Sequence, residues 1–238
     1  MAVPLEDLET GEAFGHFHGK NLTNCPASAC ICGFPSAIAW VLGDFPDTMS
    51  SAMKPELLKR EACVLVAIDF QEKLLPHIAG RDPLIGKAGL LLDSARELGI
   101  PVLVTEQYPK GLGPTVPGIK GAIPGFKPIE KNCFSCAGEP GFLAQFDALK
   151  RSQAVLIGVE THVCVAQTAV DLASRGISVF VAADACGSRH PRDAELALRR
   201  MEAAGVVVTG AEAVVFEWLG RAGSPEFKKV QTRVKEAG

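Results

Sequence analysis

The chain has 238 residues, of which 47% are hydrophobic and 21% are charged, so it can bury a sizeable core as a globular protein. Its 24 basic and 27 acidic residues nearly balance, which argues against a nucleic-acid-binding surface or a basic membrane patch. No apolar run reaches the ~18 residues of a membrane-spanning helix. Because eight cysteines occur in a chain of this size with no secretory signal, we expect free thiols and a cytoplasmic protein.

Residues 1–58 differ from the rest of the chain, because they show no sustained periodicity and are repeatedly interrupted by glycine and proline. We therefore expect an N-terminal extension that is poorly ordered or only partly packed. Five of its side chains could bind a metal ion: His16, His18, Cys25, Cys30 and Cys32. No second C-x-x-C or H-x-x-x-H pair completes a tetrahedral set, so we expect no metal here. Met53 precedes a natural domain start, and residues 1–52 could therefore lie upstream of the native start site.

Residues 59–238 alternate apolar, β-branched runs with amphipathic stretches, and this pattern predicts one α/β domain. Expected strands cover 63–70, 101–105, 154–157, 177–184 and 206–209. Expected helices cover 82–98, 142–149, 161–174, 191–203, 211–219 and 224–236. Residues 106–138 are rich in glycine and proline, and they predict a long loop of the kind that is either functional or disordered. Strands that alternate with helices predict a three-layer α/β/α fold with a mainly parallel central sheet.

Several polar residues stand at or just after the carboxyl ends of the expected strands. They are Asp69, Glu106, Cys164 and Asp184. In sheets of this kind, ligands bind beyond the carboxyl ends of the strands, so one edge of the sheet gathers the candidate chemistry. Asp184 is better explained as a structural cap than as a catalyst.

Cys164 is the candidate nucleophile. It falls in the first turn of the expected helix 161–174. Unpaired N–H groups and the helix dipole at such a position can lower the pKa of a thiol from ~8.5 to roughly 3.5–7.5. The alternative is a buried cysteine that acts as a small hydrophobic residue, as most free cysteines do.

Asp69 and Lys131 are the candidate partners of this thiol. Asp69 could cap the short segment that follows the first strand. It could also act as a general base, because an apolar edge raises the pKa of a carboxyl group and a neighbouring cation opposes that rise. Lys131 lies where the long loop returns toward the same edge. A lone lysine is most often solvated, but beside Asp69 and Cys164 it would stabilise the thiolate and orient the carboxylate.

Three motifs, in this order and spacing, resemble the isochorismatase-like cysteine hydrolase family. They are AIDFQ at 67–71, KNCFS at 131–135 and GVETHVC at 158–164. The segment TEQYPKGLGPT at 105–115 is similar to the substrate-side loop of the branch described only as isochorismatase-domain proteins. The resemblance covers about residues 60–220, and it implies the isochorismatase-like hydrolase fold for this domain.

The resemblance also implies roles for individual residues. Asp69, Lys131 and Cys164 match the catalytic Asp, Lys and Cys of the family. A cis peptide bond is expected between Val159 and Glu160, and the backbone N–H groups of Glu160 and Cys164 would form the oxyanion hole. Asp69 would take the thiol proton, and the thiolate would attack a carbonyl or nitrile-like carbon. Asp69 would then protonate the leaving amine and activate the water that releases the thioester.

Departures from the family narrow the expected chemistry. Nicotinamidase-type members carry an Asp-x-His metal set where this chain has Glu106-Gln107-Tyr108, so no metal is expected and nicotinamide is less favoured. Members that cleave the vinyl ether of isochorismate lack the cysteine, so Cys164 favours amide-type chemistry. Glu160 stands where amidase members usually have a small residue. It could narrow the pocket, or it could meet a cationic group of the substrate.

The candidate substrate contacts are Gln107, Tyr108, Phe134 and His162. For His162 the simpler alternative is a residue that faces solvent in the first turn of its helix. Cys133 and Cys136 have the C-x-x-C spacing of redox proteins, but no thioredoxin pattern surrounds them, and a dithiol role is not favoured.

The residues and the resemblance together predict a cysteine-dependent hydrolase that cleaves a C–N (amide-type) bond of a small molecule through a thioester intermediate. No cofactor, nucleic acid or membrane partner is expected, and the family favours a homo-oligomer. Two alternatives stay open: a non-catalytic oligomeric scaffold or interaction protein with the same fold, and a protein that uses Cys164 as a redox-sensing thiol. The intact set of Asp69, Lys131 and Cys164 speaks against a scaffold, which does not need all three.

Overall fold

The computed structural model describes residues 56–236. The predictions for residues 1–55, including the candidate His and Cys ligands and the alternative start site, lie outside the described residues. Near the start of the described chain, Leu58 is buried, and its N–H donates a hydrogen bond of 2.8 Å to the Glu217 carboxylate. The packed part of the described chain therefore includes this residue.

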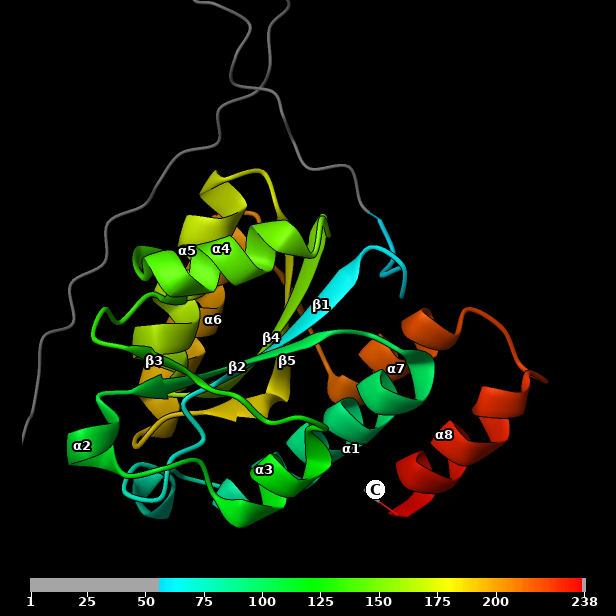
Figure 1. The fold of residues 1–238 in the computed structure, drawn as a ribbon, viewed down its shortest axis with the longest axis horizontal. Helices are drawn as coiled ribbons and strands as arrows, with labels where there is room; N and C mark the ends of the chain where they lie inside the picture. Colours follow the sequence, from blue (N-terminus) through cyan, green and yellow to red (C-terminus); the bar gives the residue numbers. More distant parts are fainter. Residues whose placement is uncertain (1–55, 237–238) are drawn as a thin grey trace, which may run out of the picture. The chain divides into compact units, whose positions relative to one another are not determined.

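Six parallel strands of the described chain form one sheet in the order β3-β2-β1-β4-β5-β6 (Figure 1). The strands are β1 (Cys63–Ile68), β2 (Val102–Gln107), β3 (Ile129–Lys131), β4 (Gln153–Val159), β5 (Ser178–Gly187) and β6 (Val207–Thr209). The order reverses between β1 and β4, which lie side by side. Parallel sheets bind ligands at the carboxyl ends of the strands beside such a reversal. Asp69 follows β1 and Cys164 follows β4, so both lie at this point.

Helices cover both faces of the sheet (Figure 1). They are α1 (Arg81–Leu98), α2 (Pro109–Leu112), α3 (Pro117–Ala122), α4 (Pro140–Ala148), α5 (Ala166–Ser174), α6 (Pro191–Ala203), α7 (Ala211–Leu219) and α8 (Pro225–Glu236), with short 3-10 turns at Leu75–His77 and Cys136–Gly138. Side chains of β1 alternate between two hydrophobic clusters: Leu65 and Ala67 pack with α1, α3, α7 and α8, whereas Val66 and Ile68 pack with α4, α5 and α6. This arrangement confirms the predicted three-layer α/β/α fold.

The segment 106–138, expected to be one long loop, contains regular structure. β2 extends through Gln107, α2 and α3 follow, and β3 adds a short edge strand. The prediction of a long irregular loop is therefore wrong. β3 has only three residues, and one of its two buried side chains is a lysine, so its sequence lacks an apolar pattern. Because β3 pairs in parallel with β2, with Gln107 opposite Lys131, it carries Lys131 to the carboxyl edge of the sheet.

β5 is longer than its sequence predicts, and Asp184 therefore lies inside the strand. The β5–β4 pairing shifts register between Leu156 and Gly158 and then continues to a pair formed by Val159 and Gly187. The Asp184 carboxylate accepts a hydrogen bond of 2.7 Å from the backbone N–H of Ala211, at the start of α7. This contact confirms that Asp184 is a structural cap.

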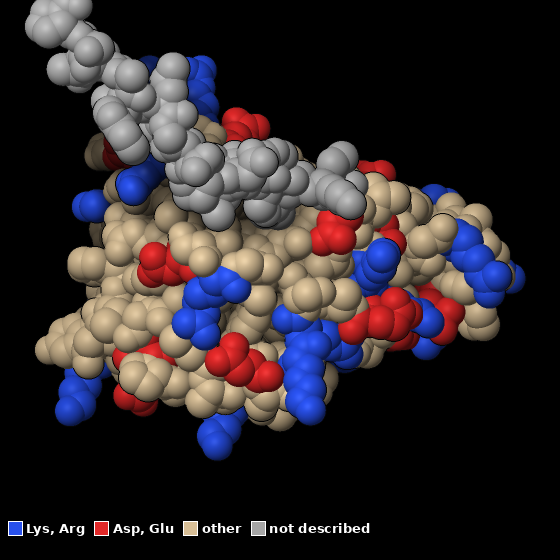
Figure 2. Space-filling model, turned by 90° about the horizontal axis from the view of Figure 1, so that it is seen from above, with Lys and Arg blue, Asp and Glu red and all other residues tan. Residues whose placement is uncertain are grey.

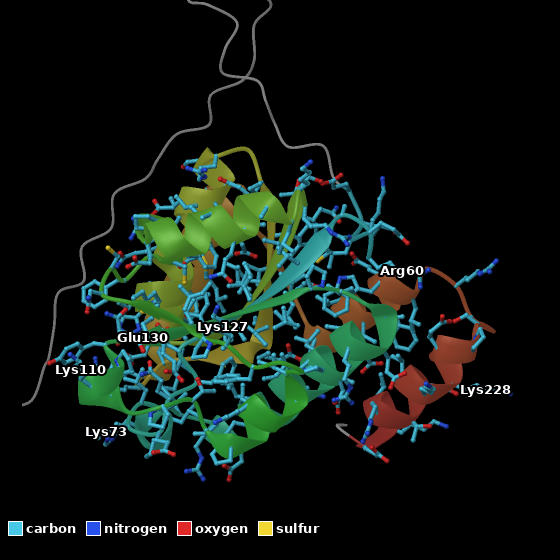
Figure 3. All side chains as sticks on the ribbon, in the orientation of Figure 1. Arg60, Lys73, Lys110, Lys127, Glu130 and Lys228 are labelled. Carbon is cyan, nitrogen blue, oxygen red and sulfur yellow. The ribbon has the colours of Figure 1, made fainter. Side chains whose placement is uncertain are left out.

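The surface of the described residues is mixed in charge. On the face shown in Figure 2, basic and acidic side chains are interspersed rather than gathered into areas of one sign. Lys110 and Lys228, labelled in Figure 3, project from the surface, as solvated lysines do. Among residues 56–236, none of the helices combines the length and the apolar character that crossing a membrane requires.

Candidate active site

Asp69 is the first residue after β1, and it is completely buried. Its backbone φ is 55°, in the left-handed region that Asp and Asn tolerate better than most residues. Its N–H donates to the carbonyl of Thr105 at 3.2 Å, and its Oδ1 accepts a hydrogen bond of 2.7 Å from the Thr105 hydroxyl. Both bonds tie Asp69 to β2, so the direction of its carboxylate is fixed.

Lys131 is the last residue of β3, and its side chain is fully buried. The ammonium nitrogen lies 2.8 Å from Asp69 Oδ2 and 2.6 Å from Gln107 Oε1. The carbonyl oxygens of Cys133 and Phe134 lie 3.3 and 3.2 Å away. The alternative of a solvated lysine, like those in Figure 3, is therefore wrong here.

The charge of Lys131 is set by a balance between burial and attraction. Burial alone lowers the pKa of this ammonium group, but the negative charge of Asp69, which also accepts a hydrogen bond from it, outweighs burial and raises the pKa. Lys131 is therefore positively charged at neutral pH, and it compensates the charge of the buried Asp69 carboxylate.

Cys164 lies in a π-helical turn, Thr161–Val165, that joins β4 to α5. Only 5% of the residue is exposed, and its thiol interacts with Asp69 and Lys131. Burial, followed by the negative charge of Asp69, raises the pKa of the thiol, and the positive charge of Lys131 does not offset this. The expected lowering of the pKa is wrong for this structure, because a buried thiol beside a carboxylate keeps its proton even near a helix N-terminus.

The structure thus brings together the three residues that the sequence singled out, from the ends of three different strands. A protonated thiol meets a carboxylate, and the carboxylate is held on its other side by a buried ammonium ion. A thiol with a base in contact and a third group that orients the base is the general arrangement of an activated nucleophile.

The peptide bond between Val159 and Glu160 is cis, as the resemblance predicts. Glu160 is nearly buried, and its Oε1 accepts two hydrogen bonds from Arg189, one from the backbone N–H at 3.2 Å and one from Nε at 2.9 Å. The sequence left open whether Glu160 narrows the pocket or meets a cationic substrate group. In the structure the Glu160 carboxylate instead forms an ion pair with Arg189 of the same chain.

Gln107 lies in the site, but both ends of its amide group are engaged within the chain. Its Oε1 accepts a hydrogen bond from Lys131, and its Nε2 donates one of 2.9 Å to the carbonyl of Asn132. This side chain is placed to orient Lys131. Tyr108 and Phe134 are 54% and 55% exposed, and each belongs to a segment that contacts Lys131 through its backbone. Their role as substrate contacts stays a prediction.

His162 lies on the α6 side of the π-helical turn. Its Nδ1 is 2.9 Å from the hydroxyl oxygen of Ser188. Together with residues of α6, including Arg200, it lines a cavity of about 210 Å³ that none of Asp69, Lys131 and Cys164 lines. A substrate contact by His162 therefore requires that the substrate reach past the π-helical turn, and it too stays a prediction.

Three residues that hold the site in place were not identified from the sequence: Gln71, Thr105 and Thr168. Gln71 exchanges hydrogen bonds with the backbone of Gln107, at 2.8 and 3.0 Å. Thr168 donates to the Cys164 carbonyl at 2.7 Å and accepts from the Cys136 N–H at 2.9 Å. Gln71 stands in the AIDFQ motif and Thr168 one helical turn after Cys164, so both could have been found by spacing. Thr105 carries no such signal, because its contact depends on the strand register.

Glu106 stands at the carboxyl end of β2 but serves the loop rather than the site. Its Oε1 accepts hydrogen bonds of 2.7 Å from both the N–H and the hydroxyl of Thr115. Among the described residues, no group of three or more His, Cys, Asp or Glu side chains is placed to hold a metal ion.

The fold and the site define a class: an α/β protein with a parallel sheet whose carboxyl edge carries a buried carboxylate, an ammonium ion and a thiol. Comparison with known proteins agrees with this class. The isochorismatase domain matches residues 63–213. Isochorismatase domain-containing protein 2A of Mus musculus is 41% identical over 177 residues, which are 74% of this chain and 84% of the relative. The Homo sapiens protein named isochorismatase domain-containing protein 2 is 38% identical over 174 residues, 73% and 83% of the two chains.

Solved structures give the same result. A Caenorhabditis elegans protein described as MAR1 ribonuclease has a TM-score of 0.72 and 38% identity, and the match covers 76% of this chain and 93% of that one. YcaC from Pseudomonas aeruginosa has a TM-score of 0.72 and 25% identity, with coverage of 76% and 92%. The chain belongs to the isochorismatase family. Family membership supports a hydrolase, and it does not specify the substrate.

Proposed function

We propose that the protein is a cysteine-dependent hydrolase that cleaves the C–N bond of a small amide through a thioester on Cys164. The observation that supports this most directly is the buried contact of Asp69 with both Lys131 and the Cys164 thiol. Buried charges cost free energy unless they are paired, and this pair lies beside a nucleophile at the binding edge of a parallel sheet. That combination suits catalysis better than packing.

In the first half of the reaction, Asp69 accepts the proton of the Cys164 thiol, and the sulfur forms a bond to the amide carbon. The electron pair of the C=O π bond moves onto the carbonyl oxygen. Because the pKa of the thiol is raised, this proton transfer is unfavourable before the substrate binds. It is favoured as the S–C bond forms, and Lys131 remains beside the negative charge while that charge moves from the carboxylate to the reacting atoms.

The developing oxyanion requires donors that are fixed before the reaction. The backbone N–H groups of Glu160 and Cys164 are the candidates, because Glu160 directly precedes the π-helical turn and Cys164 lies within it. N–H groups in the first turn of a helix point along its axis toward the N-terminal end and lack intrahelical partners. Donors of this kind usually contribute the largest electrostatic stabilisation in acyl transfer.

In the second half, the protonated Asp69 gives its proton to the amide nitrogen, the C–N bond breaks, and the amine leaves. The acyl group stays on Cys164 as a thioester. Asp69 then accepts a proton from water while the water oxygen adds to the thioester carbon. The C–S bond breaks, the sulfur regains a proton, and the carboxylic acid product leaves.

Two relatives bear on this proposal through their descriptions. The YcaC structure from Pseudomonas aeruginosa contains covalent acrylamide. Acrylamide is an electrophile, so that protein carries a group that reacts as a nucleophile. The Caenorhabditis elegans relative is described as a ribonuclease, and RNA therefore belongs in any substrate panel for this chain.

The test is covalent trapping with a panel of small amides. The protein is mixed with each amide, quenched in acid and analysed by intact mass, while release of the amine or ammonia is followed in parallel. We expect an acyl adduct on Cys164, and we expect Cys164→Ala and Cys164→Ser to lose both the adduct and turnover. Cys133→Ala is the matched control, because it removes an exposed thiol from the same edge. Turnover that survives in Cys164→Ala would overturn the proposal.

The same preparation separates the remaining alternatives. A scaffold would show no turnover of any amide, and a redox sensor would react with peroxide at Cys164 without turning over amides. Cleavage of RNA that persists in Cys164→Ala would point to an activity that does not use this thiol. The homo-oligomer stays a prediction, and light scattering of the purified chain measures it directly.

A further inference from the structure

We infer that the substrate of the proposed hydrolase carries a carboxylate, and that the guanidinium group of Arg189 binds it. The inference rests on the proposed function, because it names the class of amide that the site accepts. It makes Arg189 a residue that determines specificity, outside the set of Asp69, Lys131 and Cys164.

Arg189 lies at the same edge of the sheet as the nucleophile. It follows β5 by two residues, and Gly187, the last residue of β5, pairs with Val159 of β4. Val159 directly precedes the cis peptide bond and the π-helical turn that contains Cys164. Arg189 is therefore joined to the segment that carries the nucleophile through both strand pairing and its contact with Glu160.

The contact with Glu160 fixes Arg189 but does not use up its donors. Glu160 Oε1 accepts from Nε of Arg189 at 2.9 Å and from its backbone N–H at 3.2 Å. The two terminal nitrogens of the guanidinium group have no acceptor among the described residues, and the side chain is 58% exposed. These two nitrogens form a planar fork that matches the two oxygens of a carboxylate.

The other cation of the site cannot serve this purpose. Lys131 is fully buried, and its three N–H bonds point toward four acceptors within the chain. An external anion would have to displace one of them. Arg189 can bind an anion without breaking its bond to Glu160, and because Glu160 already holds the guanidinium plane, less side-chain entropy is lost when the anion binds.

The test measures binding without turnover. In the Cys164→Ala background, the affinity is measured calorimetrically for monoamides of three- to five-carbon dicarboxylic acids and for the methyl ester of each. We expect the best acid to bind about 10-fold or more tighter than its ester, because a hydrogen-bonded ion pair contributes roughly this much. Adding Arg189→Gln should bring the two affinities within about 2-fold of each other. Arg189→Lys should keep only part of the preference, because it keeps the charge and loses the fork.

Turnover in the protein with Cys164 intact gives the second measurement. We expect Arg189→Gln to raise KM for the acid by about 10- to 100-fold with a much smaller change in kcat, and to leave KM for the ester nearly unchanged. The matched control is Arg192→Gln, since Arg192 is an exposed arginine that also pairs with a glutamate, Glu195, three residues further along the chain. A purely structural role for Arg189 would change the acid and the ester equally.

Equal or undetectable binding of acid and ester in the Cys164→Ala background overturns the inference. So does a preference that survives Arg189→Gln and is lost instead in Arg200→Gln, since Arg200 lines the neighbouring cavity. The failure of the proposed function looks different: the acid is then bound through Arg189, but no amide is hydrolysed and no adduct forms on Cys164. Hydrolysis of neutral amides with no preference for acids supports the hydrolase and rejects the carboxylate.

Discussion

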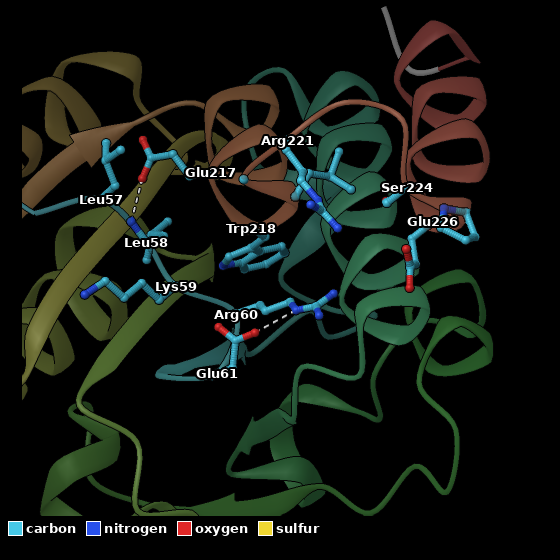
Figure 4. A pocket seen from close by; sticks show the side chains of 13 residues that line it. Leu57, Leu58, Lys59, Arg60, Glu61, Glu217, Trp218, Arg221, Ser224 and Glu226 are labelled. Carbon is cyan, nitrogen blue, oxygen red and sulfur yellow. Dashed lines mark hydrogen bonds and ion pairs between the residues drawn. The ribbon is translucent and has the colours of Figure 1, made fainter.

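The two ends of the sheet differ in how far their ion pairs are exposed to solvent. At the carboxyl end, Asp69 and Lys131 form an ion pair of 2.8 Å in which both side chains are fully buried. At the amino end of β1, a cavity of about 670 Å³ opens between residues 57–61 and helices α7 and α8 (Figure 4). There, Arg60 pairs with Glu61 at the same distance of 2.8 Å, but these side chains are 45% and 75% exposed.

The cavity at the amino end is larger than the one that His162 lines, but cavity size is not what places the proposed site. A charge that is buried interacts strongly with its neighbours, whereas an exposed pair in water is screened and contributes little. At the carboxyl end, within residues 56–236, a buried carboxylate contacts both a buried cation and the thiol of Cys164. We expect substitutions at that end to change activity and stability strongly, and equivalent substitutions around the cavity at the amino end to change little.

The largest expected effect is that of Asp69→Asn on turnover. The change removes the proton acceptor of the thiol, and we expect amide hydrolysis to fall by about 10²- to 10⁴-fold. It also removes the negative charge that raises the pKa of Cys164, while Lys131 stays in place. Alkylation of Cys164 by iodoacetamide at pH 7 should therefore become faster, because more of the thiol is ionised. Peptide mass mapping after timed alkylation measures the rate.

The distinctive result for Asp69→Asn is slower amide hydrolysis together with faster alkylation of Cys164. A variant that merely unfolds would also alkylate faster, so circular dichroism at the assay temperature must match that of the unaltered protein. Asp171→Asn is the matched control, because Asp171 is an exposed carboxylate on α5, the helix that follows the nucleophile. Slower alkylation of Cys164 in Asp69→Asn would show that the carboxylate does not hold the proton on the thiol.

Lys131→Met should have the largest effect on stability. It leaves the Asp69 carboxylate buried without a cation, and breaking a buried pair in this way typically costs 3–5 kcal/mol. Urea unfolding gives the free energy, and turnover is expected to be lost as well. The double variant Asp69→Asn/Lys131→Met should recover part of the stability, because no unpaired charge remains. A loss for Lys131→Met no greater than for Lys59→Met, at an exposed lysine of the amino-end cavity, would mean that the two ends do not differ.

The carboxyl-end site is only partly predictable from the sequence. Some of its residues belong to strands with a clear local pattern, whereas others depend on tertiary contacts. β1 is a continuous apolar strand that ends in a carboxylate, and β4 is an apolar strand followed by a helical pattern. Both can be recognised locally, so Asp69 and Cys164 could be placed at one edge. Asp184 could likewise be recognised as a cap. Local pattern and tertiary position agree at these residues.

Lys131 and the pKa of Cys164 are different, because both depend on tertiary contacts. β3 is too short to show a periodic pattern of apolar residues. Its lysine is buried because Asp69 and Gln107, on other segments of the chain, supply acceptors for its ammonium group. The place of Cys164 near a helix N-terminus predicts a lowered pKa, but burial and Asp69 reverse the sign. The resemblance to a family supplied the role of Lys131, which residue-by-residue reasoning left open.

Alkaline pH should reveal a property that the two ends share. Burial raises the pKa of Cys136, beside the site, to about 11 and that of Cys63, at the start of β1, to about 12. An unfolded thiol ionises near ~8.5. Because each thiol holds its proton more tightly in the folded protein, it contributes to the free energy of unfolding. This contribution is complete below pH ~8.5 and is lost as the pH rises toward the folded-state pKa, by at most about 1.4 kcal/mol per pH unit for each thiol.

Urea unfolding between pH 8 and pH 11 measures this slope, which is independent of the packing cost of each substitution at neutral pH. Cys136→Ala and Cys63→Ala should each flatten the slope, and Cys133→Ala, at an exposed thiol, should not. If Cys136→Ala alone flattened it, charges of the site rather than burial would control these thiols, and the contrast between the two ends would be sharper than we describe.

The smallest effect is expected for Arg60→Gln, which breaks the exposed pair with Glu61 at the mouth of the amino-end cavity. Because water and salt already screen this pair, we expect the urea midpoint and amide turnover to match those of the unaltered protein. The pair has the same length as the buried one, so the comparison isolates burial from distance. A clear fall in turnover would break the contrast between the two ends, because it would require that the larger cavity act on the thiol from the other end of the sheet.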